Sequence, residues 1–195
     1  MSANASGYHL FDTALGACAV AWNANGITQL QFAEKDRATT EKRIRTRSGA
    51  EPQTPPRPVA DAIALVQRYL TGERIDFSNV AVDLPNAGEF HKRLYAALRT
   101  VSWGRTTTYG GLGKMLEEMI DARDIGQAMG KNPVPIIIPC HRVLAAGNKI
   151  GGFSAPGGIA TKEKLLALEG VAPGVSEDAP VFPGLFTTPQ RRAAR

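Results

Sequence analysis

The sequence predicts an α/β protein of the α+β type, with a small N-terminal sheet accompanied by helices and a mostly helical C-terminal region. Three observations support this class. Apolar residues alternate around a hairpin signal at Asn25-Gly26, later segments repeat their apolar residues with helical spacing, and a short apolar run between prolines precedes Cys140. With 195 residues, of which 43% are hydrophobic, the chain can bury a core in one or two domains.

The first expected element is an antiparallel sheet over residues 7–33. Asn25-Gly26 is a typical two-residue hairpin turn, and alternating apolar side chains lie on both sides of it. Cys18 belongs to this alternation, so its thiol is expected in the core and not at a reactive site.

Two helices are expected next. One covers residues 35–47, which are rich in Lys and Arg, and the other covers 59–70, where the apolar residues have helical spacing. The segment 48–58 contains four prolines together with Gly and Ser, which predicts a loop between the two helices.

Residues 77–84 are expected to form a strand that ends at Pro85. The turn that follows is the expected boundary between an N-terminal domain, 1–85, and a C-terminal domain, 86–170. The last segment, 171–195, has four prolines and ends with three arginines in its last five residues, so we expect a flexible basic tail there.

Four helices are expected in the C-terminal domain, and the middle two are typical of a helix-turn-helix unit. The four cover 90–101, a segment beginning near Tyr109, 122–131 and 159–169. In the third of them, small residues recur every four positions and give one face almost no bulk; they are Ala122, Gly126 and Gly130, with Arg123 and Gln127 in the adjacent row. Such a face suits either close approach to a DNA groove or tight helix packing, and the helix alone favours neither interpretation.

Composition limits the class of protein. The net charge is +5, and residues 86–170 hold 11 basic and 7 acidic side chains, which mildly favours a polyanionic partner. Two cysteines make no disulfide framework, and three histidines without a Cys-x-x-Cys give no recognisable zinc site. The N-terminus lacks the features of a secretory signal, and no segment has the roughly 18 apolar residues of a membrane span, so we expect a cytoplasmic protein.

The segment Asn132–Val143, NPVPIIIPCHRV, carries the strongest chemical signal. Its isoleucines predict apolar surroundings that raise the pKa of Cys140, so the thiol needs a base, and His141 is the candidate. Neighbours in an extended segment point to opposite sides, so contact between them needs a bend or a water, and Pro139 disfavours a central strand. An isolated pair of this kind is more often a buried structural cysteine beside a surface histidine.

Glu169 is a second chemical signal because it lies in the last turn of the expected helix 159–169. A carboxylate at that end gains nothing from the helix dipole, which favours cations there. Another group should therefore interact with Glu169, and Glu169 is a candidate for the residue that orients a histidine. The alternative is a solvent-exposed glutamate.

The 132–143 segment, followed by GGFSAPGG at 151–158 and KEKLLALEG at 162–170, resembles the active-site region of the O6-alkylguanine-DNA alkyltransferases. The PCHRV string is highly specific to that family, and the similarity runs from about Phe90 to Gly170. The resemblance implies a DNA-repair protein that moves an alkyl group, such as methyl, from O6-alkylguanine in double-stranded DNA onto its own cysteine. It implies a single irreversible turnover without a cofactor, by a protein that we expect to be a monomer. Some members of the family carry a structural zinc near the N-terminus, but this sequence lacks the ligands for it.

For the chemistry, the resemblance implies that Cys140 accepts the alkyl group. His141 would take the thiol proton through a water while Glu169 holds the imidazole. Asn132 would fix the turn that presents the cysteine. The hydroxyl of Tyr109 would meet the guanine and supply a proton as the base leaves.

For binding, the resemblance implies that the second helix of the helix-turn-helix approaches the minor groove and that the damaged nucleotide is flipped out. Arg123 would enter the stack in its place. The flipped base would meet main-chain carbonyls of Cys140 and Val143, the aromatic wall of Phe153, and Ser154. The remaining expected DNA-binding residues lie on or beside the bare helix face, and they are Ala122, Gly126, Gln127, Gly130 and Lys131.

Two departures from the family pattern are visible. Phe153 stands where the family often has a tyrosine, so a hydroxyl contact is lost there while the aromatic wall remains. The joint between the middle helices, LEEMIDARD, carries several acidic residues that should weaken binding to a phosphate backbone; they are Glu117, Glu118, Asp121 and Asp124.

Three other classes remain as alternatives: a lesion-binding relative that flips alkylated bases without reacting, a thiol hydrolase, and a helix-turn-helix regulator. The lesion-binding relatives lack the cysteine, whereas Cys140 is present here. A hydrolase would need an oxyanion hole, to which no part of the sequence points, and a regulator rarely needs a reactive thiol behind its recognition helix.

Overall fold

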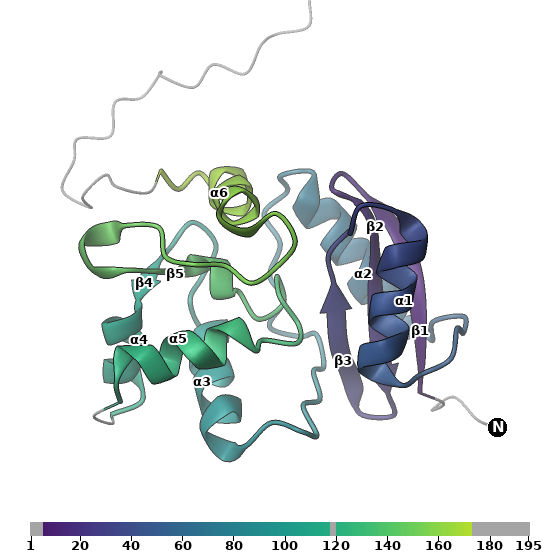
Figure 1. Cartoon of the computed structure of the whole chain (residues 1–195), viewed down its shortest axis with the longest axis horizontal. Helices are drawn as coiled ribbons and strands as arrows, with labels where there is room; N and C mark the ends of the chain where they lie inside the picture. The colour runs from purple at the N-terminus through teal and green to yellow at the C-terminus, as the bar shows by residue number, and fades with distance from the viewer. Residues whose placement is uncertain (1–5, 118–119, 173–195) are drawn as a thin grey trace, which may run out of the picture.

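The computed structural model describes residues 6–117 and 120–172, and it confirms the α+β class. A three-stranded antiparallel sheet lies at one end of the molecule, and most of the helices lie at the other (Figure 1). The strands follow the chain in the order β1-β2-β3, with the bounds Gly7–Thr13, Gly16–Asn23 and Gly26–Gln31.

Both faces of the sheet are covered by helices. α1 (Arg37–Ser48) and α2 (Arg57–Leu70) lie on opposite faces, as Figure 1 shows. Alternation along β2 sends Cys18 into the main core and Ala19 into a smaller cluster with Ile44 of α1. Cys18 is fully buried, so the expectation that its thiol is a core residue is confirmed.

The hairpin turn lies one residue earlier than the sequence suggested. Ala24 and Asn25 form the turn, and Gly26 is already the first residue of β3, with φ at 154°. The side chain of Asn23 accepts hydrogen bonds from the backbone N–H groups of Asn25 and Gly26 and so holds the turn. A Cβ on Gly26 would lie 2.6 Å from the carbonyl oxygen of Ala81, so this close approach requires glycine.

The strand predicted over residues 77–84 is wrong. Only one bridge, from Val82 to Ile27, joins this segment to the sheet. The guanidinium of Arg99 instead donates to the carbonyl oxygens of Phe77, Ser78 and Val80 in this segment. These bonds bend the segment around an arginine that lies far along the chain, which the local pattern of apolar residues did not indicate.

The C-terminal half contains the remaining helices. Their bounds are α3 Glu89–Arg99, α4 Tyr109–Met115, α5 Ala122–Gly130 and α6 Gly158–Leu168, with short 3-10 turns η1 Cys140–Arg142 and η2 Ala146–Asn148. α4 and α5 pack against each other as the two helices of the predicted helix-turn-helix. A parallel pair of short strands, β4 Thr107–Thr108 and β5 Val143–Leu144, joins the start of α4 to the end of η1.

One core cluster contains buried residues from both halves of the chain. Val66 and Tyr69 of α2 belong to it together with Leu98 of α3 and Ile138 from the segment before η1. Among the described residues, no helix has both the length and the apolar content that crossing a membrane requires.

Candidate active site

The 3-10 turn η1 places Cys140, His141 and Arg142 at the junction of the two halves. The chain reaches this turn through a tight segment in which the N–H of Ile138 donates to Val134 and that of Cys140 donates to Ile138. Pro139 immediately precedes η1, and no ordinary strand forms there, as expected.

Asn132 fixes the segment that leads into η1. Its amide nitrogen donates to the carbonyl oxygen of Ile138 at 2.8 Å, and its oxygen accepts from the N–H of Val134 at 3.0 Å. Between them, the β-branched Ile136 has a positive φ of 73°, a conformation that costs about 1–3 kcal/mol and persists only where neighbours enforce it. Asn132 therefore holds a strained turn directly before Cys140.

Cys140 is buried, with 7% of its surface exposed. Burial raises the pKa of its thiol, while hydrogen bonding from Asn132 and the positive charge of Lys162 lower that pKa to a smaller extent. The thiol is therefore protonated at neutral pH, and reaction at sulfur requires a base.

His141 is fully buried, and its two ring nitrogens have different surroundings. Nε2 lies 2.8 Å from Oε1 of Glu169 and 3.0 Å from the hydroxyl oxygen of Tyr69, whereas Nδ1 has no hydrogen-bond partner among the described residues. Burial lowers the pKa of His141, and the nearby Glu169 offsets this only in part. The ring is therefore neutral near pH 7 and can accept a proton.

Glu169, which directly follows α6, is held by several donors and not by solvent. Arg142 donates to it from Nε and Nη2, at 2.9 Å and 2.8 Å, and the N–H of Gly104 donates at 3.2 Å. Burial raises the pKa of Glu169, but the hydrogen bonds from His141 and Arg142 outweigh burial and bring that pKa to about 2. The alternative of a solvent-exposed glutamate is therefore wrong.

The charge of Glu169 determines which tautomer His141 adopts. An ionised carboxylate can only accept hydrogen bonds, so a nitrogen 2.8 Å from its oxygen must carry a hydrogen. Nε2 is therefore the protonated nitrogen of the neutral ring, and Nδ1 carries the free lone pair.

Sequence reasoning missed three members of this cluster: Tyr69, Arg142 and Lys162. Lys162 is 1% exposed, and its Nζ donates to the carbonyl oxygen of Val143. A lysine within the apolar row of α6, three residues before Leu165, was a usable signal for a buried cation. Tyr69 had no such signal, because a tyrosine on the apolar face of a helix is ordinary core.

Tyr109 begins α4 and is brought toward Cys140 by the pairing of β4 with β5. Its pKa is raised by burial and, to a smaller extent, by charge at Cys140, so the hydroxyl keeps its hydrogen and can donate. The hydroxyl lies against the main chain of the glycine loop, where a Cβ on Gly151 would be only 2.9 Å from it. In the same loop Phe153 packs edge-on against Phe32, and Ser154 is exposed.

The bare face of α5 lies at the surface. Gly126 is half-buried, and its nearest neighbour is the ring of Tyr109; the other expected DNA-binding residues of this helix and its end are exposed, namely Ala122, Arg123, Gln127, Gly130 and Lys131. Exposure excludes tight helix packing as the role of Ala122 and Gly130, whereas Gly126 lies against the ring of Tyr109. Asp121 caps α5 by accepting from the N–H of Arg123, while Glu118 lies outside the described residues.

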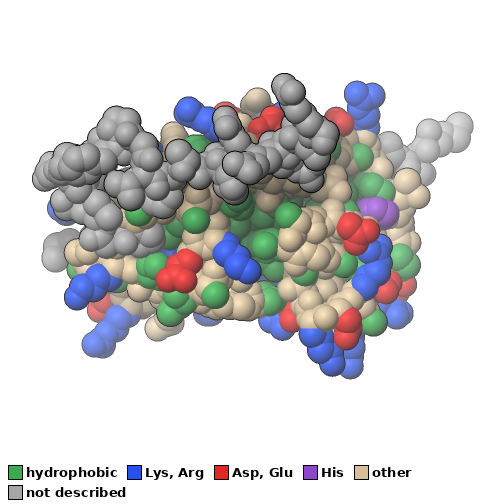
Figure 2. Space-filling view, turned by 90° about the horizontal axis from the view of Figure 1, so that it is seen from above, with side chains coloured by type: hydrophobic (Ala, Val, Ile, Leu, Met, Phe, Trp, Pro, Cys, Tyr) green, Lys and Arg blue, Asp and Glu red, His purple; other side chains and the backbone are tan. Residues whose placement is uncertain are grey.

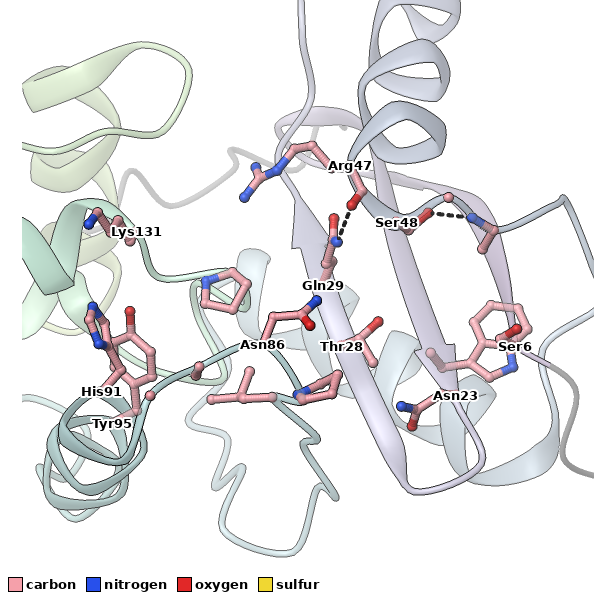
Figure 3. A pocket seen from close by; sticks show the side chains of 18 residues that line it. Ser6, Asn23, Thr28, Gln29, Arg47, Ser48, Asn86, His91, Tyr95 and Lys131 are labelled. Atoms are coloured by element: carbon pink, nitrogen blue, oxygen red, sulfur yellow. Dashed lines mark hydrogen bonds between the residues drawn. The ribbon is translucent and has the colours of Figure 1, made fainter.

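A cavity of about 520 Å³ lies between β3 and α3, and Cys140 is not among the residues that line it. Its lining includes Gln29, Arg47, His91 and Lys131 (Figure 3). Where Figure 2 shows the described side chains, basic and acidic ones are interspersed. Among the described residues, no cluster of three His, Cys, Asp or Glu side chains could hold a metal ion.

Comparison with protein families assigns both halves of the chain. Residues 7–84 match the family described as "6-O-methylguanine DNA methyltransferase, ribonuclease-like domain", and residues 89–171 match "6-O-methylguanine DNA methyltransferase, DNA binding domain". The methylated-DNA--protein-cysteine methyltransferase of Sulfolobus acidocaldarius is 34% identical over 164 residues, which are 84% of this chain and 93% of that protein.

Solved structures give the same result. The crystal structure of Mycobacterium tuberculosis O6-methylguanine methyltransferase has a TM-score of 0.69 and 31% identity, covering 88% of this chain and 97% of that one. A second M. tuberculosis structure, described as OGT in complex with DNA, has a TM-score of 0.67 and 30% identity, covering 83% of this chain and 91% of that one.

Proposed function

The chain belongs to the 6-O-methylguanine DNA methyltransferase family, and on that premise we propose that Cys140 receives the alkyl group that the protein removes from DNA. One observation carries this proposal. Directly beside Cys140, the buried His141 binds Glu169 through Nε2 and keeps an unbonded Nδ1, which is the arrangement a general base requires.

The first step is removal of the thiol proton. No hydrogen bond joins Cys140 to Nδ1 of His141, so a bridging water carries the proton from sulfur to that nitrogen. Glu169 stabilises the imidazolium that forms, and Lys162 favours the thiolate.

The second step is transfer of the alkyl group. The thiolate attacks the alkyl carbon, a carbon–sulfur bond forms, and the bond from that carbon to O6 of guanine breaks. Its electron pair remains on the guanine, which Tyr109 stabilises by donating a hydrogen bond and then a proton. The proton that His141 took from the thiol then replaces the one that Tyr109 gave to the guanine, so both side chains end neutral. The thioether on Cys140 does not hydrolyse, so each molecule reacts once.

The remaining site residues position the base. Asn132 holds the turn that presents the sulfur. The main-chain carbonyls of Cys140 and Val143 accept from the exocyclic amine of guanine. Phe153 supplies an aromatic wall, and Ser154 meets the O6 side from the glycine loop.

Double-stranded DNA carrying O6-alkylguanine is the partner, and the exposed face of α5 enters its minor groove. The main chain at Ala122, Gly126 and Gly130 approaches the DNA closely, because these residues place no large side chain between the helix and the DNA. Arg123 fills the place of the flipped nucleotide, and Gln127 and Lys131 meet the strand beside it.

We further propose that the chain acts as a monomer of two domains, 1–85 and 86–170, in the cytoplasm. The two family matches meet close to this boundary. A reducing compartment suits a reaction that consumes a free thiol.

Intact-mass analysis tests the chemistry. The protein is incubated with a duplex containing one O6-methylguanine, and we expect the mass of one methyl group to be added, located at Cys140 by peptide mapping. Cys140→Ser should bind the same duplex without gaining mass. Binding without methylation of the native chain would select a lesion-binding protein, and turnover of an ester or amide would select a hydrolase; either result would overturn the proposal.

A comparison of two substrates tests the DNA-binding role. Arg123→Ala should slow methyl transfer from the duplex much more than benzyl transfer from free O6-benzylguanine, because the free base needs no flipping. Arg57→Ala, on the exposed start of α2, is the matched control and should change neither rate. Equal slowing of both substrates by Arg123→Ala would remove its flipping role.

A further inference from the structure

Tyr69 connects the N-terminal half of the chain to the reactive centre. It lies on α2, within the part that matches the ribonuclease-like domain, and it is fully buried. Its hydroxyl group is 2.8 Å from Oε1 of Glu169 and 3.0 Å from Nε2 of His141, both of which belong to the C-terminal half. No other described residue before residue 85 makes a hydrogen bond to either side chain.

The hydrogen atoms of this cluster can be assigned from its charges. Glu169 is ionised and only accepts, so the hydroxyl hydrogen of Tyr69 points to Glu169. The hydroxyl oxygen is then left as an acceptor, and the hydrogen on Nε2 of His141 is directed at both this oxygen and Oε1 of Glu169. Tyr69 thus braces the same Nε2–H that leaves Nδ1 as the free base.

The ring of Tyr69 is held in place by aromatic neighbours from both halves of the chain. Phe77 and Trp103 contact it edge-on, with ring centroids 5.7 Å and 5.4 Å away. Burial raises the pKa of Tyr69, and the negative charge of Glu169 raises it further, so the hydroxyl stays protonated. Its position and its hydrogen are therefore both determined before any substrate arrives.

We propose that Tyr69 is a positioning residue for alkyl transfer: it holds the His141 ring, whose tautomer Glu169 determines, in the orientation that leaves Nδ1 available to the thiol. This inference rests on the function proposed above. It gives the N-terminal half a direct part in activating the nucleophile, beyond supporting the fold. Tyr69 acts only through His141 and Glu169 and touches neither the sulfur nor the base.

Tyr69→Phe tests the proposal, with Tyr8→Phe as the matched control. Tyr8 is also a buried tyrosine, and its hydroxyl also donates to a glutamate, Glu41 at 3.0 Å, but this pair lies between β1 and α1, away from Cys140. Single-turnover rates are measured for the full chain with the O6-methylguanine duplex and with free O6-benzylguanine. Tyr69→Phe should slow both about tenfold, which is the rate equivalent of one lost hydrogen bond, while Tyr8→Phe keeps both rates.

The hydrogen bonding of Nε2–H of His141 is the readout that a merely structural role would not change. The chain has only three histidines, so 15N labelling of histidine gives three assignable rings in NMR spectra. In the native chain the signals of His141 should show hydrogen on Nε2, and in Tyr69→Phe the resonance of this hydrogen should shift because one of its two acceptors is lost, while His9 and His91 remain unchanged.

The outcomes separate this inference from the proposed function. A Tyr69→Phe variant that reacts at the native rate, or that reacts slowly with an unchanged His141 spectrum, would overturn the role of Tyr69 while leaving alkyl transfer to Cys140 intact. A native chain that gains no methyl group would instead contradict the proposed function. Slowing with the duplex alone would place the effect of Tyr69 in DNA binding and would also overturn the inference.

Discussion

Nε2 of His141 lies 2.8 Å from Oε1 of Glu169, and neither side chain is exposed to solvent. The same carboxylate binds Arg142, so one negative charge both orients the base His141 and neutralises a buried guanidinium. Removing that charge should therefore affect both the reaction and the stability of the fold, in a way that can be measured separately.

Glu169→Gln should destabilise the protein by up to about 3–5 kcal/mol, because it leaves the Arg142 guanidinium buried without its counter-ion. Alkyl transfer by the folded fraction should also slow, since the amide cannot stabilise an imidazolium at His141. Urea unfolding and single-turnover rates measure the two effects. Glu163→Gln, on the exposed side of α6, should stay within about 0.5 kcal/mol of the native chain, and equal stability of both variants would contradict the prediction.

Acid should destabilise the native chain through two groups. The folded pKa of His141 is below its ordinary value near 6.5, so below that pH the unfolded chain binds a proton that the folded chain does not. The free energy of unfolding then falls with pH, by at most about 1.4 kcal/mol per pH unit for this group. The contribution of Glu169, whose folded pKa is about 2, is present above its ordinary value of about 4.3 and is lost as the pH falls toward 2.

The variant His141→Gln isolates the first contribution. Urea unfolding between about pH 8 and about pH 5 should give a shallower dependence of stability on pH than in the native chain, since His9 and His91 are common to both proteins. Identical slopes would show that His141 is protonated in the folded state as easily as in the unfolded one.

Lys162→Met should raise the pKa of Cys140 further, because it removes the positive charge that favours the thiolate. The rate of alkylation of the thiol by iodoacetamide should reach its midpoint at a higher pH than in the native chain. Lys164→Met, two residues along α6 and exposed, is the control and should leave the midpoint unchanged. A midpoint unaffected by Lys162→Met would mean that the lysine only satisfies the carbonyl of Val143.

Gly151→Ala should slow alkyl transfer, since the added Cβ would lie 2.9 Å from the hydroxyl oxygen of Tyr109 and must displace it. Gly152→Ala, with nothing within 4 Å of the new Cβ, is the neighbouring control and should react normally. Both rates are measured with free O6-benzylguanine, which removes DNA binding from the comparison. If the two variants react alike, the position of the Tyr109 hydroxyl does not limit the reaction.

The sequence predicted most of the helices because their periodicity is local. The helix starts were within about two residues, as for α1 and α2, and the first was placed too early because Asp36, the residue that caps α1, was counted as part of the helix. The strand at 77–84 was wrong because Arg99 determines the shape of that segment from outside it. Local patterns contain no information about a partner that lies far along the chain.

For the same reason, some residues of the candidate site were predicted from the sequence and others were not. Cys140 and His141 are adjacent and belong to a recognisable motif. Glu169 could be identified because a carboxylate in the last turn of a helix gains nothing from the helix dipole. Tyr69 could not be found in this way, because its hydroxyl meets His141 only after the two halves of the chain pack together. Its position in the apolar row of a helix predicted a core residue, and Tyr69 is indeed buried in addition to its contact with His141.

The deep burial of Cys140 also affects the protein before it meets any damaged DNA. Peroxides and soluble electrophiles attack the thiolate, and a sulfur that is covered and kept protonated offers them little of it. Because this acceptor can be used only once, shielding it from casual oxidants preserves the working lifetime of every copy.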